Sequence, residues 1–159
     1  MATFSRSRRD TADVPHPVDA VWELLVDPDA VARLTPMVAR IEADGDQWLW
    51  CLQGVPLPGR ALDLSMLETM SFTPQSRIDF THGELERHLQ AGAEGHYGLE
   101  PASDDGTRLT IDLTITARLP IPGVARPAVH TAMSQVLRHM GDRFASNMLR
   151  ELDRRRSRS

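Results

Sequence analysis

The spacing of hydrophobic and polar positions divides the chain into a strand, two short helices, a run of strands and one long helix. Residues 3–13 alternate without a breaker, which is compatible with a strand. Apolar residues then fall at helical spacing over residues 16–25. A second helix is expected to start at Asp27-Pro28, with Asp27 as its N-cap, and to end before Thr35. The chain should therefore begin with one strand that leads into two short helices.

Turn-forming residues at hairpin spacing divide the middle of the chain into six further strands. These turn signals fall at residues 44–46, 56–59, 74–76, 82–83 and 103–106. The clearest strand, residues 107–117, alternates leucine and isoleucine with threonine and aspartate. This alternation predicts an antiparallel sheet with one buried and one solvated face.

Helical spacing returns after residue 123 and continues for about thirty residues, with an apolar stripe that includes several methionines. Because an antiparallel sheet with one apolar face needs a cover, this helix should lie across the sheet. The predicted fold is α+β: a curved seven-stranded antiparallel sheet, two short helices and one long C-terminal helix. We expect a single domain over residues 1–153 and a disordered, Arg-rich tail over residues 154–159.

Composition narrows the possible functions. The 159 residues contain one cysteine, Cys51, so neither an intrachain disulfide nor a zinc–thiolate cluster is expected. All 18 basic residues are arginine, which excludes lysine Schiff-base chemistry, and the net charge of -4 disfavours a general nucleic-acid binder. No apolar stretch approaches the ~18 residues of a membrane span, and the N-terminus lacks a secretory signal, so a cytoplasmic protein without stable membrane insertion is predicted.

One segment near the N-terminus resembles a known superfamily. The run Val14-Pro15-His16-Pro17-Val18-Asp19-Ala20-Val21-Trp22-Glu23-Leu24-Leu25, followed by Asp27-Pro28, is similar to the passage from first strand to first helix in the helix-grip, or SRPBCC, superfamily. That superfamily includes START lipid-transfer domains, pathogenesis-related allergens and polyketide cyclases. The resemblance implies a helix-grip fold with a pocket between sheet and last helix. It does not select one function, and no catalytic motif of a subfamily transfers.

Polar residues that interrupt apolar rows are the candidates for a site. Glu68 shares strand parity with Met66 and Met70 and should point inward, where a carboxyl either has a raised pKa or needs a cation or hydrogen-bond donor opposite it. Arg6, Arg8 and Asp10 on the first strand share a face and could supply such a partner. The alternative is that Glu68 lies at a strand end and reaches solvent.

Tyr97 follows a row of small residues that would leave space above the sheet, and its hydroxyl could orient a ligand. Ordinary core packing is the alternative for Tyr97, for the tryptophans and for the flexible methionines of the last helix. The expected ligand-binding residues are Trp48, Trp50, Met66, Glu68, Met70, Tyr97, Met133, Val136, Met140 and Phe144, with Glu68 and Tyr97 as candidate catalytic residues.

No cofactor and no metal site are expected. His130 and His139 are nine residues apart on the last helix and would lie on opposite sides of it, and no HExxH motif occurs.

Three functions are consistent with these patterns. The first is binding of a small hydrophobic or amphipathic ligand between the sheet and the C-terminal helix. The second is an enzyme similar to polyketide cyclases and dehydratases, using the same cavity. The third is an interaction module that binds an acidic partner through its Arg-rich ends. The same sequence pattern suits an open pocket and a filled core, and it carries no signal for oligomeric state.

Overall fold

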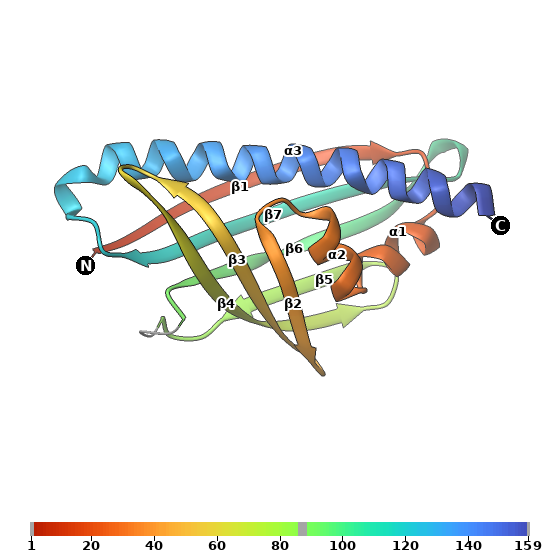
Figure 1. Ribbon diagram of the computed structural model, residues 1–159. Helices are drawn as coiled ribbons and strands as arrows, with labels where there is room; N and C mark the ends of the chain where they lie inside the picture. The colour runs from red at the N-terminus through yellow and green to blue at the C-terminus, as the bar shows by residue number, and fades with distance from the viewer. Residues whose placement is uncertain (1, 86–88, 159) are drawn as a thin grey trace.

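A curved seven-stranded sheet dominates the computed structural model, which describes residues 2–85 and 89–158 (Figure 1). The strands lie in the order β1-β7-β6-β5-β4-β3-β2, and consecutive neighbours pair antiparallel. Their bounds are β1 Ala2–Val14, β2 Val38–Asp44, β3 Gln47–Leu57, β4 Arg60–Thr73, β5 Arg77–His82, β6 Ala91–Ala102 and β7 Gly106–Leu119. All seven predicted strands are confirmed.

Three α-helices accompany the sheet: α1 Val18–Leu25, α2 Pro28–Leu34 and α3 Arg126–Arg158. Short 3₁₀ turns, Ser103–Asp105 and Gly123–Ala125, precede β7 and α3. Asp27 caps α2 as predicted, because its carboxylate accepts hydrogen bonds from the backbone nitrogens of Asp29, at 3.1 Å, and Ala30, at 3.3 Å. Pro28 occupies the first turn, where its missing N–H costs nothing.

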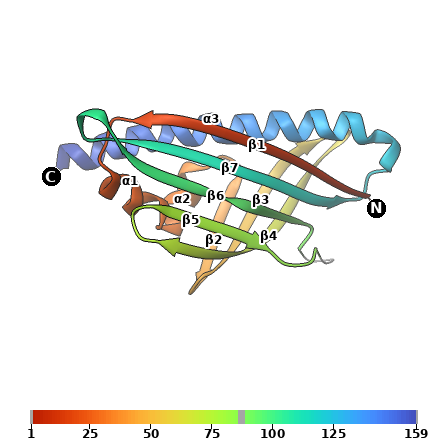
Figure 2. The same ribbon diagram turned by 180° about the vertical axis from the view of Figure 1, so that it is seen from behind.

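Helix α3 runs along the sheet beside β1, and its C-terminal end lies near α1 (Figures 1 and 2). This arrangement is the predicted helix-grip fold. The N-terminus of the chain lies at the opposite end of the sheet. The sheet and α3 therefore face one another, with α1 and α2 near the C-terminal end of α3.

Two glycines allow the sheet to bend. In β6, a Cβ atom at Gly95 would lie 1.9 Å from the carbonyl oxygen of Asp112 on β7, and the residue has φ +150°. Only glycine permits this close approach. In β3, the register with β4 shifts between Leu52 and Val55, where Gly54 has φ +67° and donates its N–H to Asp63 Oδ1 at 3.0 Å. These irregularities increase the curvature that makes room under α3.

The expected disordered tail is not present as such, because α3 continues to Arg158. Glu151 accepts hydrogen bonds from Arg154, one turn further on, and from Arg155 Nε at 3.2 Å. Arginine has a high helix propensity, and a positive charge near a helix C-terminus interacts favourably with the helix dipole. The composition suggested a solvated tail, but the spacing to Glu151 keeps these residues helical.

Candidate ligand-binding cavity

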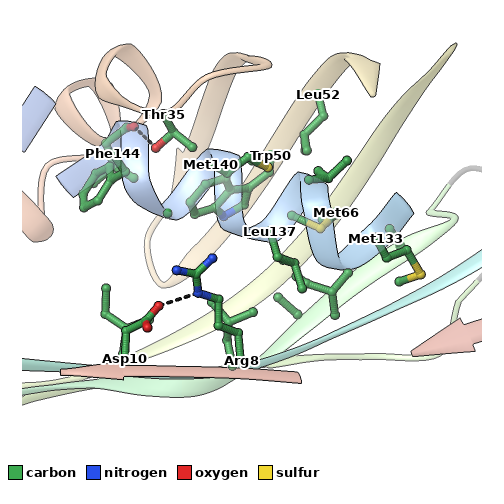
Figure 3. A pocket seen from close by; sticks show the side chains of 18 of the residues that line it. Arg8, Asp10, Thr35, Trp50, Leu52, Met66, Met133, Leu137, Met140 and Phe144 are labelled. Atoms are coloured by element: carbon green, nitrogen blue, oxygen red, sulfur yellow. Dashed lines mark hydrogen bonds and ion pairs between the residues drawn. The ribbon is translucent and has the colours of Figure 1, made fainter. Parts of the chain in front are cut away.

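A cavity of about 410 Å³ lies between the concave face of the sheet and α3. Every strand except β2 contributes to its wall, together with α3, Val31 of α2 and Thr35 after it. Figure 3 shows the α3 side chains Met133, Met140 and Phe144 across the pocket from β1. The sequence pattern was compatible with both an open pocket and a filled core. The structure has the open pocket.

Most of the wall is apolar. Strand β7 contributes the alternating row Leu109, Ile111, Leu113 and Ile115. This row was predicted to be buried but was not included among the ligand-binding candidates. The alternation over residues 107–117 was the signal that could have identified it.

Eight of the ten expected ligand-binding residues line this cavity. They are Trp50, Met66, Glu68, Tyr97, Met133, Val136, Met140 and Phe144. The lining places these side chains where a ligand would contact them. Their roles in binding stay predictions.

Trp48 and Met70 are buried but do not line the cavity. Their strand parity correctly predicted that both side chains point inward. The part of the sheet that holds them, however, lies close to α1. The ring of Trp48 lies 6.1 Å from that of Phe72, which in turn lies 6.3 Å from Trp22 of α1. Trp22, Phe72 and Trp48 therefore form an aromatic cluster, and none of the three lines the cavity.

Glu68 of β4 points into the cavity and is 3% exposed, so the alternative of a solvated strand end is wrong. Burial raises the pKa of its carboxyl from 4.5 to about 8, and the nearby Trp50 indole offsets part of that rise. The group is therefore mostly protonated at neutral pH.

Trp50 is the diagonal neighbour of Glu68 across the β3–β4 pair, because Trp50 pairs with Met66 and Trp48 with Glu68. The Trp50 Nε1 atom is buried and has no hydrogen-bond partner among the described residues. The indole is close enough to influence the Glu68 pKa, but the geometry between them does not form a hydrogen bond. An unsatisfied donor therefore lies beside the carboxyl group.

Tyr97 of β6 completes this polar region of the wall. Its ring lies 5.3 Å from that of Phe80, and burial, with the Glu68 charge as a second cause, raises the pKa of its hydroxyl well above the ordinary range. Trp50, Glu68 and Tyr97, called here the polar wall, come from three different strands.

Arg8 lies on the opposite side of the pocket, on β1 (Figure 3). It forms an ion pair with Asp10 on the same strand and another with Asp142 of α3, 3.4 Å from Arg8 Nη2 to Asp142 Oδ1. The expected pairing of Glu68 with an arginine of β1 is therefore wrong. Arg6 also has another partner, since its Nε donates to Ser134 Oγ at 2.9 Å. Strand parity identifies a shared face but does not select partners across a cavity.

His82 pairs with Glu68 in the register of β4 and β5, yet it is not its partner. The His82 ring lies against Gly92, where a Cβ atom would be 2.3 Å from His82 Cγ, and His82 Nδ1 is 2.7 Å from the Gly83 carbonyl oxygen. In the part of the chain that the structure describes, no group of three or more His, Cys, Asp or Glu residues is arranged to hold a metal ion. No helix in that part is long and apolar enough to cross a membrane.

Comparison with known proteins identifies the family. A family model described as "Polyketide cyclase / dehydrase and lipid transport" matches residues 1–151. The chain belongs to this family. No curated protein matches the chain.

Several solved structures share the fold of this family member at low sequence identity. The Zhui aromatase/cyclase from Streptomyces sp. R1128 has a TM-score of 0.68 and 17% identity, over 95% of each chain. A START superfamily protein from Mycobacterium smegmatis has a TM-score of 0.63 and 15% identity, over 93% of this chain and 97% of the other. The di-domain ARO/CYC StfQ of the steffimycin pathway has a TM-score of 0.69 and 18% identity, over 97% of this chain and 52% of the other.

Proposed function

We propose that this family member binds a small hydrophobic or amphipathic molecule in the cavity between the sheet and α3. The observation that carries the proposal is an apolar space of about 410 Å³ with polar atoms confined to a few positions. Ligand pockets typically measure about 300 to 1,000 Å³ and combine apolar walls with a few polar groups that fix orientation. Burial of apolar ligand surface supplies the free energy of binding, at about 25 cal/mol per Å².

The family description names lipid transport beside cyclase and dehydrase activities, which supports a hydrophobic ligand. The experiment is a fluorescence titration with Nile red, an uncharged hydrophobic dye, combined with native mass spectrometry of the gently purified protein and organic extraction. Saturable binding of one dye per chain, or a co-purifying apolar molecule, is the expected result.

A matched pair of variants on α3 tests whether the dye binds in this cavity. Met140→Trp places a larger side chain in the pocket and should weaken Nile red binding at least tenfold, because it removes space from the pocket. His139→Trp is the control, because His139 is exposed and does not line the cavity. Equal binding by both variants, with intact folding by circular dichroism, would contradict the proposal.

A cyclase is the second candidate, favoured by the position of Glu68. A carboxyl with a pKa near 8 takes and returns protons at neutral pH, and Tyr97 lines the same cavity. In an aldol ring closure, the Glu68 carboxylate would remove a proton from the carbon between two carbonyls. That carbon would then bond to the carbon of a different carbonyl group, whose oxygen would take up the proton from Glu68. Loss of the resulting hydroxyl group, together with the remaining proton of the attacking carbon, would release water and form a carbon–carbon double bond.

The test of this second function uses a short linear poly-β-ketone thioester as substrate. Mass spectrometry should find a cyclised product lighter by one water, formed by the wild-type protein and not by Glu68→Gln. Nile red binding by Glu68→Gln separates loss of chemistry from loss of the cavity. A product formed equally by both proteins would remove Glu68 from the reaction.

A further inference from the structure

The polar wall of the cavity contains a buried hydrogen-bond donor that has no partner among the described residues. Trp50 Nε1 is a donor only, and it is buried without an acceptor among the described residues. The Tyr97 hydroxyl lies in the same wall and can both donate and accept a hydrogen bond. A buried donor left unsatisfied carries a free-energy cost, because folding has taken away its hydrogen bonds to water. A ligand that brings an acceptor oxygen to this wall removes that cost.

The charges along the cavity determine which acceptor is suitable. Of the ionisable groups that line it, Arg8 and Asp10 lie on β1, Asp142 on α3, Glu68 on β4 and Tyr97 on β6. Arg8 is the cation among them, and both Asp10 and Asp142 already neutralise it. A ligand carboxylate at the polar wall would therefore face Glu68 with no unpaired cation among these groups. Burial of an unpaired carboxylate is strongly unfavourable.

We propose that the cavity selects uncharged amphiphiles, whose carbonyl or hydroxyl oxygen accepts a hydrogen bond from Trp50 Nε1 beside Glu68 and Tyr97, over amphiphiles that carry a carboxylate. This inference rests on the proposed function, because it specifies the ligand class of the same cavity.

A cationic amphiphile fits the same wall less well. An ammonium group has donors and no acceptor, so the Trp50 N–H would stay unsatisfied. The oxygen of an uncharged ligand accepts a hydrogen bond from Trp50. Its second lone pair can accept a hydrogen bond from the Glu68 carboxyl or the Tyr97 hydroxyl. Glu68 is mostly protonated at neutral pH, so it also presents a donor.

The experiment compares three probes with the same alkyl chain at pH 7: 1-dodecanol, dodecanoate and dodecylammonium, each below its micelle concentration. Their affinities are measured by displacement of Nile red from the wild-type protein. Binding of 1-dodecanol should be at least tenfold tighter than that of dodecanoate, and tighter than that of dodecylammonium. Equal or tighter binding of either charged probe would overturn the inference while the proposed function stands.

The variant Trp50→Phe removes the indole donor and keeps an aromatic ring. It should weaken 1-dodecanol binding about fivefold to tenfold, which is the loss of one hydrogen bond. Trp48→Phe is the matched control, because Trp48 is buried on the same strand and does not line the cavity. Unchanged binding by Trp50→Phe would overturn the assigned donor. If Nile red and all three probes fail to bind the wild-type protein, the proposed function itself fails.

Discussion

The buried carboxyl group of Glu68 makes the stability of this protein depend on pH. Its carboxyl is buried within the apolar interior, and burial raises its pKa to about 8. In the unfolded chain the same group has its ordinary value of 4.5. Between these two values the folded chain holds a proton that the unfolded chain releases, so this contribution to stability is present below about pH 4.5 and is lost as pH rises toward 8.

The free energy of unfolding should therefore fall as pH rises from about 4.5 to about 8. At about 1.4 kcal/mol per pKa unit, the loss is at most about 5 kcal/mol, and water entering the cavity reduces it. Glu68→Gln should remove this slope and become more stable than wild type at pH 9. Urea unfolding at several pH values measures it, with the exposed Glu94→Gln as control. Parallel pH profiles for wild type and Glu68→Gln would contradict the conclusion that the Glu68 carboxyl is protonated in the folded chain.

At the scale of elements, an ion pair between Arg8 and Asp142 joins β1 to α3 at the cavity wall. Arg8 lines the cavity with its side chain 25% exposed, whereas Asp142 on α3 is 67% exposed. Exposed ion pairs contribute about 0 to 1 kcal/mol to stability. We therefore expect the Arg8–Asp142 pair to affect ligand exchange between β1 and α3 more than it affects folding.

Arg8→Met should accelerate the release of Nile red severalfold and change the free energy of unfolding by less than about 1 kcal/mol. The reason is that the ion pair joining β1 to α3 is lost while the apolar stem is kept. Stopped-flow displacement measures the release rate. Arg9→Met is the matched control, because Arg9 pairs with Asp112 on neighbouring β7 and does not line the cavity. Equal release rates in the two variants would show that ligand exchange takes another route.

The sequence predicted these elements well because their signals are local. Hairpin turns and alternation located the six strands after α2, and Asp27-Pro28 located the start of α2. The pairing of Glu68 with an arginine of β1 was wrong, because the partners of these residues depend on how β1, α3 and β4 are placed across the cavity. Trp48 had the correct parity and still lies outside the cavity, since parity carries no information about which helix covers each end of the sheet.

At the scale of the whole molecule, the end of α3 connects three parts of the chain. Glu151 binds Arg33 of α2, with Arg33 Nη2 to Glu151 Oε1 at 3.3 Å, as well as the arginines that follow it. These guanidinium groups lower the pKa of the Glu151 carboxyl, with the hydrogen bond from Arg33 as the largest cause. Arg156 donates to the carbonyl oxygen of Pro15, and its Nη2 lies 2.8 Å from His16 Nδ1.

Deletion of residues 154–159 should lower the free energy of unfolding by about 1 to 3 kcal/mol at pH 7, because Glu151 loses two of its arginine partners and Pro15 loses its donor. Thermal and urea unfolding measure the change, and Arg158→Ala, at an exposed position, is the control. Unchanged stability would favour the solvated tail expected from composition. Binding to an acidic partner, tested on the same deletion, remains the separate prediction for these arginines.

The methionines of the cavity wall make ligand binding sensitive to oxidants. Met66, Met133, Met140 and Met148 all line the space, and Met140 is more exposed than the other three. Oxidation converts a thioether into a polar sulfoxide, which places an unsatisfied acceptor on an apolar wall. Peroxide should therefore attack Met140 first and release a bound amphiphile without unfolding the sheet. Methionine sulfoxide reductases can reverse this change, so an oxidant could turn binding off and a reductase could restore it.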